Sequence, residues 1–144
     1  MYCTVADIIN DVTEARLIEL TDDSATPTAV VVPLVEAKII ESDNIINSYI
    51  QQIAVLPITN SADLSVLKTI SITLSVCDLW QRRLQAEMSE NIINRRNYAM
   101  AMLKDITKGV IKLNTPTIAT AIGKPFLKVS RRTSRWEKNY FNGN

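Results

Sequence analysis

The sequence contains no histidine and only two cysteines in 144 residues. The commonest general base is therefore missing, and with it serine-type triads and papain-like cysteine chemistry. Cys3 and Cys77 lie far apart, and neither has a second cysteine at metal-ligand spacing. This excludes zinc sites and disulfide frameworks, and Cys77 is expected as a small buried residue on a helix face. No glycine-rich phosphate loop is present either. We therefore expect no enzyme activity, no catalytic residue, no metal and no cofactor.

Glycine and proline are scarce as well, at 3 and 5 residues. Sandwiches and barrels need many tight turns, whereas a chain with few breakers can form long helices. The densest apolar stretch, residues 29–35, is interrupted by Pro33 and is far shorter than the roughly 20 residues that cross a bilayer. The N-terminus lacks a basic region followed by an apolar core, so no secretory signal is expected. The sequence predicts a helical protein that is made in the cytoplasm and has no membrane partner.

Capping signals place two short helices near the N-terminus. A hydroxyl at Thr4 and a carboxylate at Asp7 are typical of a helix start, which predicts a helix over about residues 5–11. Thr13 opens a second turn or helix, and it ends in the polar run of residues 21–28, which we interpret as a loop.

Three long helices follow. Pro33 suits the first turn of an amphipathic helix that reaches about residue 53. A stretch without breakers over about residues 62–86 is apolar on most sides, which predicts a helix at the centre of the fold. Ser89 opens the last helix, and Gly109 stands where a left-handed residue should end it.

These signals together predict an all-α fold, a small bundle of four to five helices with an extended C-terminal arm. The bundle should form one helical domain over residues 1–113, and the arm should cover residues 114–144. The run Val110–Leu113 is a candidate short strand, and further short strands are expected at most in the arm.

Charge is divided unevenly along the chain. Residues 1–123 contain 10 Lys and Arg against 14 Asp and Glu, whereas residues 124–144 contain 6 against 1. The sequence thus predicts a mildly acidic body with a basic segment at its end, which we call the docking segment (residues 124–144).

Half of the aromatic side chains in the protein also lie in the docking segment. A tail that only keeps a protein in solution is normally poor in aromatic residues, whereas Arg and Trp are common anchors of interfaces. We therefore expect the segment to grip another protein; folding back onto the body and binding single-stranded nucleic acid are the alternatives. The candidate contact residues are Phe126, Arg131, Arg132, Arg135, Trp136, Tyr140 and Phe141.

Two arginine pairs, Arg82–Arg83 and Arg95–Arg96, are expected on consecutive helices. They are candidates for contacts between subunits, because carboxylates of a neighbouring copy would pair with them. Solvated ion pairs and contacts with nucleic-acid phosphates are the alternatives. The adjacent acids Asp22 and Asp23 lack the further oxygen ligands of a calcium loop and are interpreted as a solvated turn.

Four stretches in order along the chain resemble a family of tailed-bacteriophage proteins, the Mu-type small head–tail connector or adaptor family. Residues 1–7 (MYCTVAD) resemble the family's opening, and residues 17–23 (LIELTDD) the segment that follows it. Residues 66–83 are similar to its central helix with trailing arginines, and residues 98–109 to its closing helix with a glycine stop. The resemblance covers residues 1 to about 113.

The resemblance implies a structural virion protein, a head-completion adaptor at the head–tail interface, assembled in the host bacterial cytoplasm. Copies would form a ring, twelve-fold by analogy, between the portal protein and the tail or the next connector ring. The genomic DNA would pass through the lumen without sequence-specific binding, and the docking segment would grip the portal. A small nucleic-acid-binding helical regulator and a tail-completion protein are the alternative functions.

Overall fold

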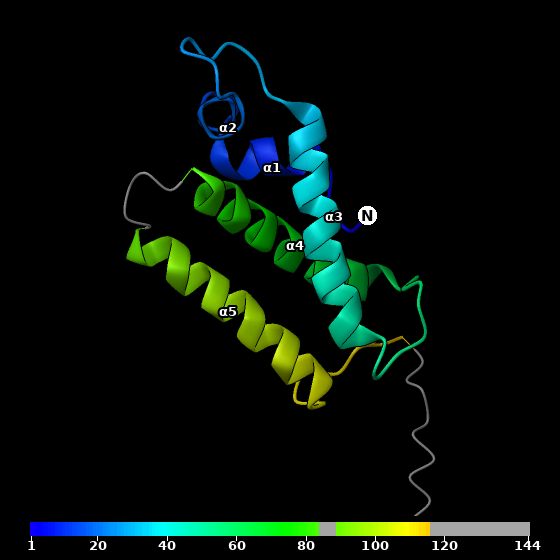
Figure 1. Ribbon diagram of the computed structural model, residues 1–144. Helices are drawn as coiled ribbons and strands as arrows, with labels where there is room; N and C mark the ends of the chain where they lie inside the picture. The colour runs from blue at the N-terminus through cyan, green and yellow to red at the C-terminus, as the bar shows by residue number, and fades with distance from the viewer. Residues whose placement is uncertain (84–88, 116–144) are drawn as a thin grey trace, which may run out of the picture.

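The computed structural model describes residues 1–83 and 89–115, and within these ranges it contains five helices and no strand. The helices are α1 (Val5–Val12), α2 (Glu14–Thr21), α3 (Val32–Ile50), α4 (Ser61–Arg82) and α5 (Glu90–Thr107). Helix α4 contacts the other four; α1 and α2 lie on one side of it and α5 runs along the other (Figure 1). The all-α fold and the central place of the fourth helix are confirmed.

The caps at the helix starts follow the expected chemistry. Thr4 and Asp7 form a capping box, in which the Thr4 hydroxyl accepts from the Asp7 N–H and the Asp7 carboxylate accepts from the Thr4 N–H. Pro33 lies in the first turn of α3, where a missing N–H leaves no hydrogen bond unmade. The Asn60 side chain accepts from the backbone N–H groups of Ala62 and Asp63 at the start of α4.

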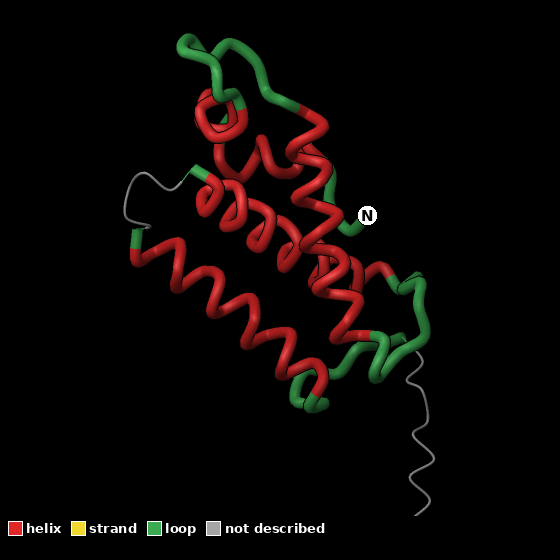
Figure 2. The backbone as a smooth tube through the Cα atoms, viewed as in Figure 1, coloured by secondary structure: helices red, strands yellow, loops and turns green. Residues whose placement is uncertain are grey.

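The end of α5 confirms one prediction and corrects another. Gly109 has φ of +73°, the left-handed conformation that a helix-ending glycine favours. The expected short strand at Val110–Leu113 is wrong, because this run is a loop (Figure 2). Its apolar residues have another role: Ile111 and Leu113 pack against the core, while Val110 stays 72% exposed.

The core has two parts that meet along α4. One lies between α3, α4, α5 and the loop after α3, and it is built on large side chains with no exposed area, namely Ile46, Ile50, Leu67, Leu74 and Leu103. The other lies between α1, α2, α3 and α4, and includes Ile8, Leu17, Val35, Ile39 and Leu79. Because α4 supplies both parts, it needs apolar residues on most sides. No helix within residues 1–83 or 89–115 has the length and hydropathy of a bilayer span.

Candidate assembly surfaces

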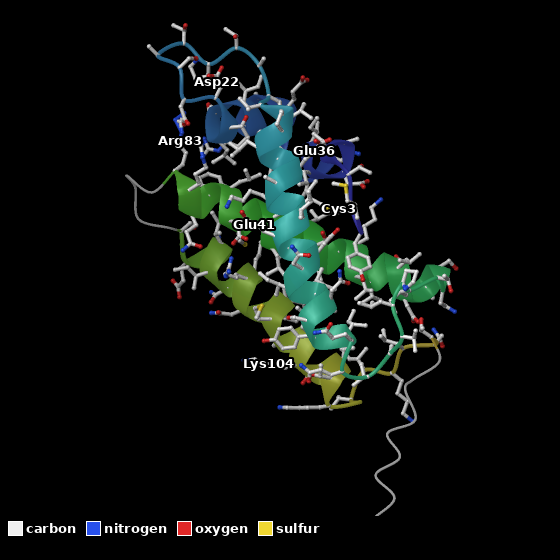
Figure 3. All side chains as sticks on the ribbon, turned by 45° about the vertical axis from the view of Figure 1, so that its right-hand side comes forward. Cys3, Asp22, Glu36, Glu41, Arg83 and Lys104 are labelled. Carbon is white, nitrogen blue, oxygen red and sulfur yellow. The ribbon has the colours of Figure 1, made fainter. Side chains whose placement is uncertain are left out.

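The first arginine pair holds the loop between α2 and α3. Arg82 donates to the Leu20 carbonyl at 3.1 Å and forms an ion pair with Asp23. Arg83 donates to the Asp22 carbonyl at 2.6 Å. These contacts tie the C-terminal end of α4 to a loop about 60 residues earlier in the chain, and Figure 3 shows Arg83 and Asp22 at this corner.

The second pair connects helices of the same bundle. Arg95 donates to the Asp11 carboxylate at 3.0 Å, which joins α5 to α1. Arg96 forms an ion pair with Asp78, which joins α5 to α4. Each of the four arginines therefore has a carboxylate or carbonyl partner within the chain. Contacts of Arg82, Arg83, Arg95 and Arg96 with another subunit stay a prediction.

A buried carboxylate on α4 anchors the root of the C-terminal arm. Asp63 is 3% exposed and accepts four hydrogen bonds, two from Asn114 and two from Thr115. The shortest are the Thr115 hydroxyl at 2.6 Å and the Thr115 N–H at 2.7 Å. Thr115 is itself 7% exposed, so the chain is fixed to the first turn of α4 at the point where the described structure ends.

Protonation of Asp63 should release this anchor. Burial alone would raise the pKa of Asp63, but the hydrogen bonds from Thr115 and Asn114 outweigh it and hold the pKa below its ordinary 3.8. A carboxylate with a lowered folded-state pKa stabilises the fold above the unfolded-state pKa, and this contribution is lost as the pH falls through the lowered value. We expect D63N to be less stable than the wild type at pH 7, and the difference to shrink as the pH falls below about 3.8.

Urea unfolding of both proteins between pH 7 and pH 2.5 measures this difference. Both proteins contain the other acids, so the contributions of these acids to the pH dependence of stability cancel in the difference. Asp7 is one of them, and its pKa is lowered by Lys68 at 2.7 Å and by Thr4. A difference that stays constant over the whole range would contradict the anchoring role of the Asp63 charge.

A second buried carboxylate fixes the N-terminal segment beside α3. Asp43 accepts from the Tyr2 N–H at 2.9 Å and from the Ser71 hydroxyl at 2.7 Å. The Tyr2 hydroxyl donates to Asn47 one turn further along α3. Burial raises the pKa of the Cys3 thiol, which lies 3.2 Å from the Ser71 hydroxyl.

A groove of about 690 Å³ opens between this N-terminal segment, α3 and the loop before α4. Its lining combines apolar and polar side chains, and it includes Met1, Tyr2, Ile40, Asn44, Asn47, Leu56, Pro57 and Leu64. Asp43 also lines it, but both carboxylate oxygens already have partners. Ile40 is 50% exposed at its edge. Met1, whose ammonium lies 3.7 Å from the Asp43 carboxylate, lines the groove as well, so a charge pair stands at its side.

The predicted portal contacts Phe126, Arg131, Arg132, Arg135, Trp136, Tyr140 and Phe141 lie outside the described residues. In the part of the chain that is described, no three His, Cys, Asp or Glu side chains gather in a way that could hold a metal ion.

The sequence model of a family described as Bacteriophage Mu, Gp36 matches residues 2–125, which is most of the chain. This chain belongs to the Bacteriophage Mu Gp36 family. Among curated proteins, no sequence matches it. Membership makes it a bacteriophage protein and is consistent with a structural or morphogenetic role in the virion.

In this Gp36-family chain, the sequence identified the arginine pairs but not their partners, and it did not identify Asp63, Asp43 or the groove. Asp63 and Thr115 are 52 residues apart, and Asp43 and Ser71 are 28 apart. An acid at a helix position normally implies a solvated side chain. The sequence nevertheless contained a signal for burial, because both acids lie on helix faces that the spacing of apolar residues predicts to be buried.

Proposed function

We propose that this Gp36-family protein is a head-completion adaptor that forms a ring beneath the portal and extends the channel for DNA. The observation that carries the proposal is the family match over residues 2–125, which spans the whole helical body. The architecture supports it, because the helical body could contact other copies within the ring while the arm that leaves it contacts the portal.

The charges of the body favour passage of DNA rather than its retention. Arg82, Arg83, Arg95 and Arg96 are engaged by acids or carbonyls of the same chain, so their charge is partly neutralised before any phosphate arrives. Each cation that contacts a phosphate adds affinity through counterion release, and strong contacts would slow a moving genome. This supports a lumen without sequence-specific binding and argues against the nucleic-acid-binding regulator.

The docking segment supplies the contact with the portal in this proposal, through its arginines and aromatic side chains. The chain that leads to this segment is fixed to the body at Thr115, through two hydrogen bonds to Asp63. The opposite side of the ring would receive the tail or a further connector ring.

The purified protein, added to portal-containing heads that lack it, tests this function. We expect it to sediment with the heads, to appear as a ring at the portal vertex in averaged electron micrographs, and to restore joining to tails. Isolated tails are the control. Binding to tails and not to heads would replace the proposal by a tail-completion role, and binding to neither would overturn both.

A further inference from the structure

One face of α3 and one face of α5 are exposed and carry opposite charges. Residues that recur every three or four positions of a helix lie on the same face. On α3 they form the α3 strip, which consists of the exposed residues Glu36, Ile40, Asn44 and Ser48. On α5 they form the α5 strip, which consists of the exposed residues Ile93, Asn97, Ala101 and Lys104. Because both strips are exposed, neither covers the other within one chain.

The charged residue of each strip is available for a contact with another molecule. The ion pairs within residues 1–83 and 89–115 involve neither Glu36 nor Lys104. Figure 3 shows Glu36 beside the upper half of α3 and Lys104 beside the lower half of α5. An acid of one copy and a cation of another can therefore pair here without breaking an ion pair that already exists.

The two strips match position by position when they run in opposite directions. Glu36 then faces Lys104, and Ile40 lies over Ala101. Ile40 is 50% exposed, and the small side chain of Ala101 leaves room for it. If the strips ran in parallel, with Ile40 again over Ala101, Glu36 would face Asn97 and the ion pair would be lost. The charges thus favour the antiparallel arrangement.

The remaining positions of the antiparallel arrangement are also compatible. Asn44 meets Asn97, and side-chain amides both donate and accept hydrogen bonds. Ser48 lies beside Ile93, and the Ser48 hydroxyl already donates to the Ile45 carbonyl of its own helix at 2.7 Å. No two like charges meet along the strips.

We propose that the α3 strip of one copy packs antiparallel on the α5 strip of the next copy. Two different faces meet in this contact, so each copy keeps a free face for a further copy, and the assembly closes into a ring or continues as a filament. The proposal rests on the ring of the proposed function and names the faces that join its copies. A single pair of helices is a small contact, so association should be weak in solution and stronger among copies held together on the portal.

Disulfide formation between two cysteine variants tests the contact. I40C and A101C are mixed in equal amounts under mild oxidation, both free at high concentration and attached to portal-containing heads, and the disulfide-linked pairs are distinguished by mass. E41C mixed with A101C is the matched control, because Glu41 is the exposed neighbour of Ile40 and lies outside the α3 strip. Cys3 and Cys77 are buried, so the wild type supplies the blank.

We expect the mixed disulfide of I40C and A101C to form at least about tenfold faster than that of E41C and A101C, because a disulfide needs its two Cβ atoms within about 4.5 Å. Adding E36K to the I40C protein should slow the reaction about threefold, since two like charges then meet. Adding K104E to the A101C protein as well should restore the rate, which a purely structural effect of either substitution would not do.

Several results would overturn the proposal. Equal rates for I40C and E41C, or a failure of K104E to restore the rate, would mean that the strips do not meet. A predominant disulfide between two I40C chains would assign the α3 strip to a symmetric dimer. Absence of the mixed disulfide, together with DNA binding that K104E removes, would assign Lys104 to phosphate contacts.

The same samples separate this contact from the connector function. Copies that attach to heads without forming the mixed disulfide would overturn the contact and leave the connector function standing. The mixed disulfide in solution, without attachment to heads, would confirm the contact and overturn the connector function.

Discussion

Removal of residues 124–144 should abolish attachment to portal-containing heads and leave the helical content nearly unchanged. The truncated chain keeps all five helices and the Asp63 anchor, and it loses six of the 16 cations and half of the aromatic side chains. A few buried aromatic and arginine anchors usually carry most of the energy of an interface. Co-sedimentation with heads measures attachment, and circular dichroism measures the helices.

Two full-length variants separate the contributions of charge and aromatic surface. We expect R131E/R132E/R135E and W136A/F141A each to weaken attachment by at least about tenfold, since interface anchors of these types often contribute 2 kcal/mol or more. The matched control is K108E, a reversal of an exposed cation on the body that should leave attachment unchanged. A truncated protein that still attaches to heads would refute the docking role of the segment.

Substitution of Leu74 by alanine should lower the free energy of unfolding by about 3–4 kcal/mol. Leu74 has no exposed area and lies in the middle of α4, the helix that contacts the other four. Truncation removes buried apolar surface and leaves a cavity that the surrounding helices fill only in part. Chemical denaturation of L74A and of the wild type measures the loss.

V55A is the control for this substitution. Val55 is 62% exposed in the loop after α3, so its truncation should change the free energy of unfolding by no more than about 0.5 kcal/mol. Equal effects of L74A and V55A would contradict the central place of α4 in the core.

The helices were predictable because their signals are local. Thr4, Pro33 and Gly109 mark boundaries through backbone chemistry that acts within one turn, and apolar spacing identifies the inward face. The prediction for residues 110–113 was wrong for the opposite reason: a short run with three apolar residues resembles a strand, but Ile111 and Leu113 pack against the helical core instead. Periodicity over four residues does not distinguish these two outcomes.

The assembly surfaces were less predictable because they depend on contacts between distant residues. The partners of Arg95 and Asp63 lie 84 and 52 positions away, and only the packing of the helices brings them together. The groove likewise combines the N-terminal segment with α3 and the loop before α4. The family resemblance identified the class of protein, which the match over residues 2–125 confirms, but it did not indicate how the arm is fixed to the body.

The Asp63 anchor also determines where mechanical tension enters the protein. If the chain beyond residue 115 is pulled, the load passes through four hydrogen bonds into the first turn of α4 before it reaches the end of α5. Since α4 contacts every other helix, the force is shared by the whole bundle, and α5 is not peeled away from its C-terminal end. A protein built in this way would transmit tension on its arm to the whole helical core.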